Sequence, residues 1–359
     1  MAGSDGSETR PAPEASVETG SAGLTQTRRY RARRLAAPVT WAILIVLGAG
    51  WVATQVLRNG LGSTGSVPQF IIITLGSVSL ASLFFLAAVG LTLIFGLMRV
   101  VNMAHGSLYL LGGYFAWALT TQMGLSWWLA ALVAMLSVGV IGLIMEQVFL
   151  RWNLGQDLRQ ALITIAISVI LADQMLAYFG GKPVVLPMPP ELAQPFKIGI
   201  YGLSYSSFRL FVIGVALAIG ILLWLWIQRT RFGMVIRAGI DDRAMASALG
   251  INVQVVFAIT FFAGSCLAAL SGVFGGTMLS LAPGQDTAFL TSSIVIVIIG
   301  GMGSLGGAAL GALLLAFVQQ YSGVYLPQNL APYSMVLTFV LVAAVLAVRP
   351  QGLFARAER

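Results

Sequence analysis

The sequence predicts an all-α membrane protein, a polytopic transmembrane helical bundle with about ten membrane segments, some of them broken or re-entrant. Three observations predict this class. Of the 359 residues, 58% are hydrophobic and only 9% are charged, unlike a water-soluble domain. Apolar runs close to the roughly 20 residues that a helix needs to cross a bilayer recur along most of the chain. These runs leave no room for a large soluble domain.

The N-terminal segment, residues 1–34, is predicted to be a disordered, basic, cytoplasmic tail. It is poor in apolar residues that could offset chain entropy, and it ends in RRYRARR. The apolar run at 38–57 is too long for a secretory signal and lacks a small-residue cleavage end, so a retained first helix is predicted. The membrane domain then covers 35–349, and residues 350–359 form a cytoplasmic C-terminal tail.

Nine further apolar runs predict the rest of the bundle. Their ranges are 70–98, 106–121, 127–150, 161–179, 209–228, 254–280, 288–300, 308–325 and 332–348. Two of them depart from a simple crossing, because 288–300 is short and 70–98 is too long to cross once without a break.

The distribution of basic residues predicts the orientation. With the N-terminus placed inside, only Arg58, Lys182, Lys197 and Arg209 of the twenty Lys and Arg fall outside. This asymmetry is expected from the positive-inside rule and places both termini in the cytoplasm. The net charge of +8 therefore reports topology, and no nucleic-acid partner is predicted.

Polar residues interrupt the apolar stretch LTLIFGLMRVVNMAHGSLYLLGGYFAW, Leu91 to Trp117. Asn102, His105 and Gly106 are predicted to break the membrane helix, so that freed backbone groups and two polar side chains face a cavity. Arg99 lies near the inner end, where its charge reaches water. The alternative for His105, the only histidine, is a hydrogen-bonded residue between packed helices.

A second interruption lies in VIVIIGGMGSLGGAALGALLLA, where five glycines fall within eight residues. This density favours broken backbone inside the membrane, which persists only where protein or a water-filled cavity satisfies its polar groups. Small residues four apart, from Gly264 to Gly276 and from Gly303 to Gly311, predict helix faces for close packing. Cys266 is predicted to be a small packing residue. From both interruptions we expect a substrate pathway that includes Asn102, His105, Gly106, Tyr109, Gly300, Gly301 and Gly303.

Two loops stand out. The longest external one, Gly180 to Ser207, is either a cover over the bundle or a docking surface for an external partner. The internal one, 229–253, concentrates charge and contains a short predicted helix that Gly250 ends. That helix is either an interfacial anchor or a contact for a cytoplasmic partner.

No catalytic, metal or cofactor site is predicted. The chain has one histidine, one cysteine and no phosphate-binding loop of the G-x-x-x-x-G-K-[ST] type. Intramembrane carboxylates are few, chiefly Asp173 and, near an inner helix end, Glu146. A proton-coupled carrier is expected to have more. Energy is therefore expected to come from another subunit.

Four motifs in order resemble the permease subunits of branched-chain amino acid ABC importers, over about residues 68–355. They are GLTLIFGLMRVVNMAHGSLYLLGGY, RTRFGMVIRAGIDDRAMASALGINV with FFAGSCLAALSGVFGG, IVIVIIGGMGSLGGAALGALLLA, and VRPQGLF. The N-x-A-H-G form of the first is similar to the H-type permease. The long N-terminus and the stretch RWNLGQDLRQ depart from the family pattern.

The resemblance implies a role and a set of partners. The chain is expected to move branched-chain or related amino acids inward across a bacterial inner membrane. Its partners are two cytoplasmic ATP-binding subunits, a second permease (M-type, or a second copy) and an extracytoplasmic solute-binding protein. The family's coupling loop to the ATPase falls on Arg237, Ala238, Asp241, Asp242, Ala246, Leu249, Gly250 and Ile251. This implication favours the partner contact over the interfacial anchor.

Two alternatives stay open at the level of sequence. Related permeases carry urea, short amides or other small polar solutes. From a different class, an autonomous secondary transporter or channel would use the same glycine-rich breaks.

Overall fold

The computed structural model describes residues 66–98, 102–153, 155–199, 202–230, 233–234, 252–325, 334–349 and 351–354. All of them belong to one unit, Asn59–Arg359. The predicted N-terminal tail, the predicted helix at 38–57, Arg99 and the eight coupling-loop residues lie outside the described residues.

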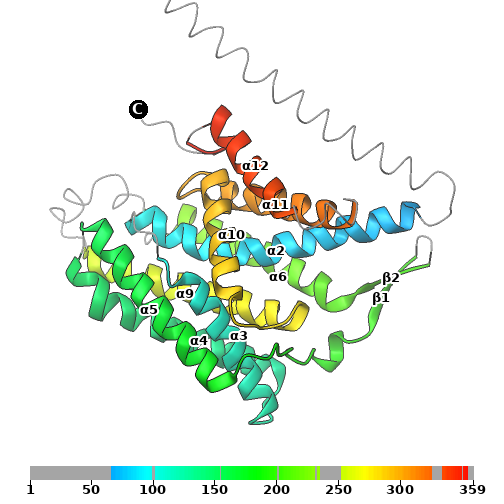
Figure 1. The fold of residues 1–359 in the computed structure, drawn as a ribbon, viewed down its shortest axis with the longest axis horizontal. Coiled ribbons are helices and arrows are strands. Elements are labelled where there is room, and N and C mark those ends of the chain that lie inside the picture. The colour runs from blue at the N-terminus through cyan, green and yellow to red at the C-terminus, as the bar shows by residue number, and fades with distance from the viewer. Residues whose placement is uncertain are drawn as a thin grey trace, which may run out of the picture. The chain divides into compact units, whose positions relative to one another are not determined.

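The described residues form helices wherever the sequence predicts them (Figure 1). The helices are α2 (Ser66–Met98), α3 (His105–Thr121), α4 (Trp127–Met145), α5 (Asp157–Phe179), α6 (Ser207–Arg229), α9 (Val253–Met278), α10 (Gln285–Gly300), α11 (Leu305–Tyr325) and α12 (Ser334–Val348). A π-helical turn (Glu146–Leu150) and two 3₁₀ turns (Arg151–Asn153 and Pro190–Leu192) complete the helical part.

The predicted number of about ten membrane segments is higher than the number of long helices in the described part of the chain. Six apolar stretches are long enough to cross a bilayer: Val67–Gly96, Trp127–Asn153, Asp157–Phe179, Ser207–Arg229, Val253–Met278 and Leu305–Tyr325. The helices α3, α10 and α12 are shorter, with 17, 16 and 15 residues. At 1.5 Å per residue they span about 23–26 Å, less than a hydrocarbon core of about 30 Å.

The expected break within 70–98 is wrong, because α2 is continuous over 33 residues. Its hydroxyl side chains do not interrupt the helix, since they donate to carbonyls one turn back, as Ser77 does to Ile73 and Thr92 does to Ala88. A helix of this length measures about 50 Å, so it tilts or extends beyond the hydrocarbon core. The interruption that the sequence predicts separately, at Asn102, His105 and Gly106, lies after α2, at the turn before α3.

Helix α9 lies against α2, α3 and α4 through small residues. Gly264 faces Gly90 of α2, with each glycine's backbone against the other. Gly272 contacts the carbonyl oxygen of Tyr109 on α3, and Cys266 lies against Gly139 of α4. The predicted small-residue face of α9 is therefore confirmed, and Cys266 is a buried, free packing residue.

The external segment is tied to the bundle. Its strands β1 (Pro195–Ile198) and β2 (Leu203–Ser206) form an antiparallel hairpin. Tyr205 bonds Ser79 of α2 through their hydroxyls at 2.7 Å, and Val184 forms a bridge with Leu281 after α9. The predicted cover over the bundle is thus present. Most of β1 is exposed, and the docking alternative stays a prediction.

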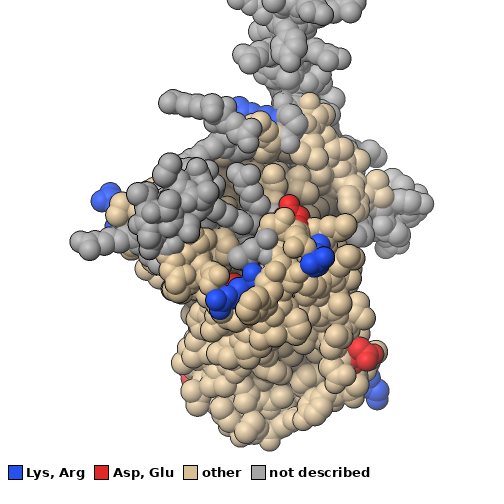
Figure 2. Space-filling model, turned by 90° about the vertical axis from the view of Figure 1, so that its left-hand side faces the viewer, with Lys and Arg blue, Asp and Glu red and all other residues tan. Residues whose placement is uncertain are grey.

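The described residues present few charges on the face that Figure 2 shows. Figure 2 shows a face on which tan residues form most of the described surface, with Lys, Arg, Asp and Glu in a few small groups. Helices α5 and α6 are the most exposed of the long apolar helices in the described part of the chain, with only three buried residues in each. Exposed apolar faces of this extent fit a lipid or subunit environment.

We expect the contact at Gly272 to decide whether the bundle packs. A methyl group there would overlap the Tyr109 carbonyl, so Gly272→Ala should lower the Tm of the detergent-solubilised protein, at a cost of about 1–3 kcal/mol or more. The matched control is Gly214→Ala in α6, where nothing lies within 4 Å of the added group. That variant should be neutral or gain up to about 1 kcal/mol. Equal Tm values for the two variants, measured by thermal size-exclusion assay, would contradict this packing.

Candidate substrate pathway

The turn before α3 is built around Asn102, which is fully buried. The Asn102 side-chain oxygen accepts from the Ala104 amide at 3.0 Å, and its carbonyl accepts from the His105 amide at 3.2 Å. The Met103 amide donates to the Thr164 hydroxyl of α5. The predicted interruption is therefore confirmed, and side-chain oxygens satisfy two of the amides that the break leaves free.

His105 lies between packed helices. Its ring is buried, and Nε2 lies 2.8 Å from the carbonyl oxygen of Ala87 on α2. The opposite nitrogen, Nδ1, has no hydrogen-bond partner among the described residues. Of the two sequence interpretations, the structure shows the hydrogen-bonded histidine, in the position that joins α2 to α3.

Gly106 and Tyr109 hold the first half of α10. A side chain at Gly106 would overlap the backbone carbonyl of Asp286, so α3 and α10 approach closely there. One turn further on, the Tyr109 ring stacks on Phe289 with ring centroids 3.9 Å apart. These two predicted pathway residues therefore fix the position of the start of α10.

Gly300, Gly301 and Gly303 form the turn between α10 and α11. Gly301 and Gly303 have φ angles of +94° and +79°, which glycine adopts without the steric penalty of a Cβ. Gly300 packs directly on Gly307 of α11. The predicted irregular backbone is confirmed, and the absence of side chains allows the two helices to touch.

Residues 351–354, part of the predicted C-terminal tail, are bound to this turn. The amides of Leu353 and Phe354 donate to the carbonyls of Ile299 and Gly300 at 2.9 and 3.1 Å. These carbonyls belong to the last turn of α10 and have no partner within the helix. The C-terminal segment thus caps α10 at the end opposite to Asp286.

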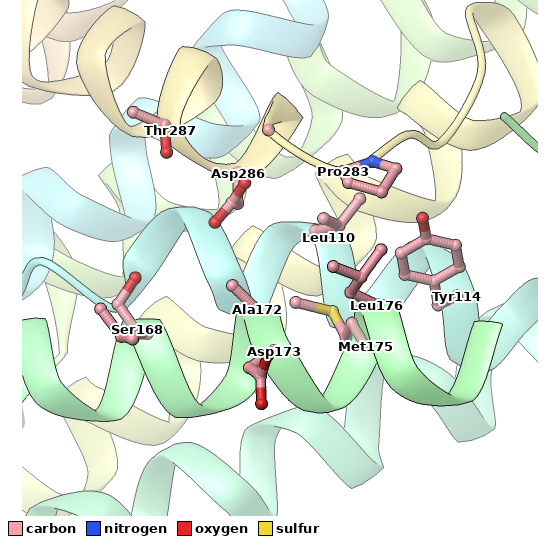
Figure 3. A pocket seen from close by; sticks show the side chains of 12 residues that line it. Leu110, Tyr114, Ser168, Ala172, Asp173, Met175, Leu176, Pro283, Asp286 and Thr287 are labelled. Atoms are coloured by element: carbon pink, nitrogen blue, oxygen red, sulfur yellow. The ribbon is translucent and has the colours of Figure 1, made fainter. Parts of the chain in front are cut away.

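A cleft of about 370 Å³ lies where α3, α5 and the start of α10 meet (Figure 3). Its polar side chains are Tyr114, Ser168, Asp173, Asp286 and Thr287. Its other lining residues are Leu110, Val169, Ala172, Met175, Leu176, Pro283 and Gly284. Figure 3 shows Asp286 extending from α10 toward α5, whereas the carboxylate of Asp173 points away from Asp286.

A second cleft, of about 400 Å³, lies among α2, α10, α11 and α12. It contains no charged side chain, and its hydroxyls at Thr291 and Ser292 bond carbonyls of their own helix. Its lining also includes Gln319 and Thr338, whose hydroxyl has no hydrogen-bond partner among the described residues, so the groove is uncharged with a few polar groups.

Of the predicted pathway residues, none lines either cleft. They lie behind the first cleft and at the far end of α10. Asp173 was expected as an intramembrane carboxylate and does line the first cleft. Asp286 was missed, because an acidic residue just before an apolar run, as in PGQDTAFL, is typical of a helix start on the surface.

Glu146 is a second buried carboxylate. It is fully buried where α4 passes into the π-helical turn, and neither of its oxygens has a hydrogen-bond partner among the described residues. Its predicted place near a helix end is confirmed. It lines neither cleft.

Apolar helices long enough to cross a membrane, two interrupted segments and a cleft that carries carboxylates are typical of a polytopic membrane transport protein. The family profile described as branched-chain amino acid transport system, permease component, matches residues 73–346. The chain belongs to this family.

Curated relatives agree with this membership. The chain is 30% identical over 295 residues to the high-affinity branched-chain amino acid transport system permease protein BraD of Pseudomonas aeruginosa, covering 78% of this chain and 94% of the relative. It is 31% identical over 297 residues to the corresponding protein LivH of Escherichia coli, with the same coverage. Among solved structures, a chain of PsaBC from Streptococcus pneumoniae matches with a TM-score of 0.44 at 13% identity, covering 76% of this chain and 89% of that one.

The contact between Gly106 and α10 provides a test of the site's construction. Gly106→Ala should displace the start of α10 and lower transport at least tenfold in the assembled complex, because the added methyl overlaps the Asp286 carbonyl. Gly306→Ala, in the first turn of α11 with nothing within 4 Å, is the matched control and should leave transport unchanged. The measurement is uptake per purified complex. Equal uptake in both variants would show that the position of α10 does not matter for transport.

Proposed function

We propose that this chain is the membrane-spanning permease subunit of an ATP-driven importer that moves branched-chain or related amino acids inward. The observation that carries the proposal is that the chain covers 94% of relatives named as branched-chain amino acid permeases. The shared region is therefore the whole bundle and not one motif. The first cleft supports the same function, because it combines an apolar wall with a buried carboxylate.

The proposed partners follow from what the chain lacks and leaves exposed. The sequence contains no phosphate-binding loop, so ATP is hydrolysed by two separate cytoplasmic subunits. The exposed apolar faces of α5 and α6 support pairing with a second permease, either the M-type homologue or another copy. An extracytoplasmic binding protein delivers the solute.

The proposed coupling element is the connection between α6 and α9. Helix α6 ends at Arg229 and α9 begins at Val253, so residues 230–252 link two membrane helices on one side. The coupling residues from Arg237 to Ile251 lie in this connection and contact the ATPase, so that its nucleotide state changes the permease conformation.

The proposed pathway follows α10. The predicted residues act at its two ends, Gly106 and Tyr109 behind the cleft, and Gly300, Gly301 and Gly303 at the turn to α11. Asn102 and His105 hold the start of α3, which carries Tyr109. Substrate passes through the cleft that these residues position.

Reconstitution tests the function directly. Proteoliposomes with the complete complex and binding protein should take up labelled leucine only when ATP is supplied to the ATP-binding subunits. The control is the same complex with a non-hydrolysable ATP analogue, which should show no uptake. Leucine uptake by the permease chain alone, without any ATP-binding subunit, would instead establish an autonomous transporter.

Thiol labelling tests the proposed orientation. In a Cys266→Ala background, Ser204→Cys in the hairpin should react with an impermeant reagent from outside. Gln156→Cys between α4 and α5, and Ser247→Cys in the coupling connection, should react only after the membrane is opened. Ser204 and Gln156 are both exposed, so access to either depends on the side of the membrane. Labelling of residue 247 from outside would reverse the orientation and remove the coupling assignment.

A further inference from the structure

We propose that the start of α10 binds the zwitterionic end of the amino-acid substrate, with the ammonium group on the Asp286 carboxylate and the substrate carboxylate on the backbone amides of Asp286 and Thr287. The proposal rests on the proposed function, amino-acid import. It adds a recognition site within the permease itself.

Asp286 is a buried carboxylate without a cation. Only 7% of the residue is exposed, and no ion pair or side-chain hydrogen bond joins its carboxylate to another described residue. The hydroxyl of Tyr114 is close enough for an electrostatic interaction, but it carries no positive charge. The carboxylate therefore faces the cleft without a positive partner among the described residues, and a cationic group in the cleft would form an ion pair with it.

Two backbone amides beside the Asp286 carboxylate are hydrogen-bond donors without an acceptor in the described part of the chain. Helix α10 starts after Gly284, whose φ is +88° and which provides no side-chain cap. The Gln285 amide donates a hydrogen bond to the carbonyl oxygen of Ala282, and the Ala288 amide donates to that of Gly284. The amides of Asp286 and Thr287 have no acceptor among the described residues. Free amides at a helix N-terminus favour an anion.

One helical turn therefore offers both signs of charge. An α-amino acid carries its ammonium and carboxylate groups on one carbon, so both groups fit a site where a carboxylate and free amides are neighbours. A simple cation would contact only the carboxylate, and a simple anion would contact only the free amides. This arrangement favours a zwitterion over urea or a short amide.

The rest of the cleft suits an aliphatic side chain. Leu110, Val169 and Met175 line it, and its volume of about 370 Å³ lies in the usual range for small-ligand sites. Across the cleft, Ser168 is held by a 2.8 Å hydrogen bond to Ser107, so this wall is fixed. The apolar wall selects among substrate side chains by their shape, while the start of α10 binds the ammonium and carboxylate groups that all α-amino acids share.

The competing interpretation is purely structural. A carboxylate in the first turn stabilises a helix through the macrodipole, and the cleft would then be filled by the second permease or by lipid. This interpretation predicts that substrate analogues have no differential effect at the cleft.

Substrate protection distinguishes the two. Thr287→Cys in the Cys266→Ala background places an exposed thiol at the cleft, in the complete complex in proteoliposomes. Leucine should slow its modification by a charged thiol reagent at least fivefold. At the same concentration, 4-methylpentanoate, which lacks the ammonium group, and leucinamide, which lacks the carboxylate, should not. Equal protection by all three, or none by leucine, would overturn the site.

A charge-removing variant completes the test. Asp286→Asn should raise the half-protecting leucine concentration at least tenfold, and Asp286→Glu should retain protection. The matched control is Asp157→Asn, at the start of α5 and outside the cleft. It should change the half-protecting leucine concentration less than twofold. Failure of Asp286→Asn to fold would leave the analogue comparison as the deciding measurement.

Leucine uptake is recorded in the same Cys266→Ala proteoliposomes. Uptake without protection contradicts this site alone, whereas no uptake contradicts the proposed function and the site together.

Discussion

The backbone contacts of α9 are the constraint on which the rest of this structure depends. In a bilayer, lipid tails are as apolar as the helices, so helices associate through close packing and hydrogen bonds. Here Gly264 meets Gly90 of α2, and Gly272 meets the Tyr109 carbonyl of α3. On the α4 side, Ser265 and Cys266 lie against Gly142 and Gly139. Larger residues would separate all three neighbours from α9.

The position of helix α10 depends on the packing of α9 against α3. Because α9 fixes α3, Gly106 and Tyr109 are in place to receive the backbone of Asp286 and the ring of Phe289. The other end of α10 is held by the contact of Gly300 with Gly307 and by the capping amides of residues 353–354. A short helix is thus fixed at both ends. It connects the cleft to the C-terminal segment, over a length of about 24 Å.

Polar groups in this bundle divide into those that hold the fold and those that remain available. Most hydroxyls of α2 are satisfied by the helix itself, and Ser271 donates to the Leu83 carbonyl to join α9 to α2. Asn102 and His105 also use hydrogen bonds to backbone groups, and these hold the turn between α2 and α3. Glu146 differs, because neither of its buried carboxylate oxygens has a hydrogen-bond partner among the described residues. Asp286 also differs, because its carboxylate faces the first cleft and no ion pair joins it to another described residue. In an apolar surrounding such groups are expensive, which is why they mark functional positions more often than structural ones.

The sequence by itself determined the class, the family and most helix positions. Composition indicated a membrane protein, because 9% charged residues is far below the roughly 25% that is typical of soluble domains. The breaks at Asn102 and at Gly300–Gly303 were visible as polar or glycine-rich interruptions. Only the tertiary structure decided that α2 is continuous, that His105 bonds Ala87, and that Asp286 is buried in a cleft while the predicted pathway residues lie behind it. The physical reason is that the helices are apolar on nearly every side. Periodicity then cannot indicate which face meets a neighbour, and that choice depends on contacts between residues far apart in the chain.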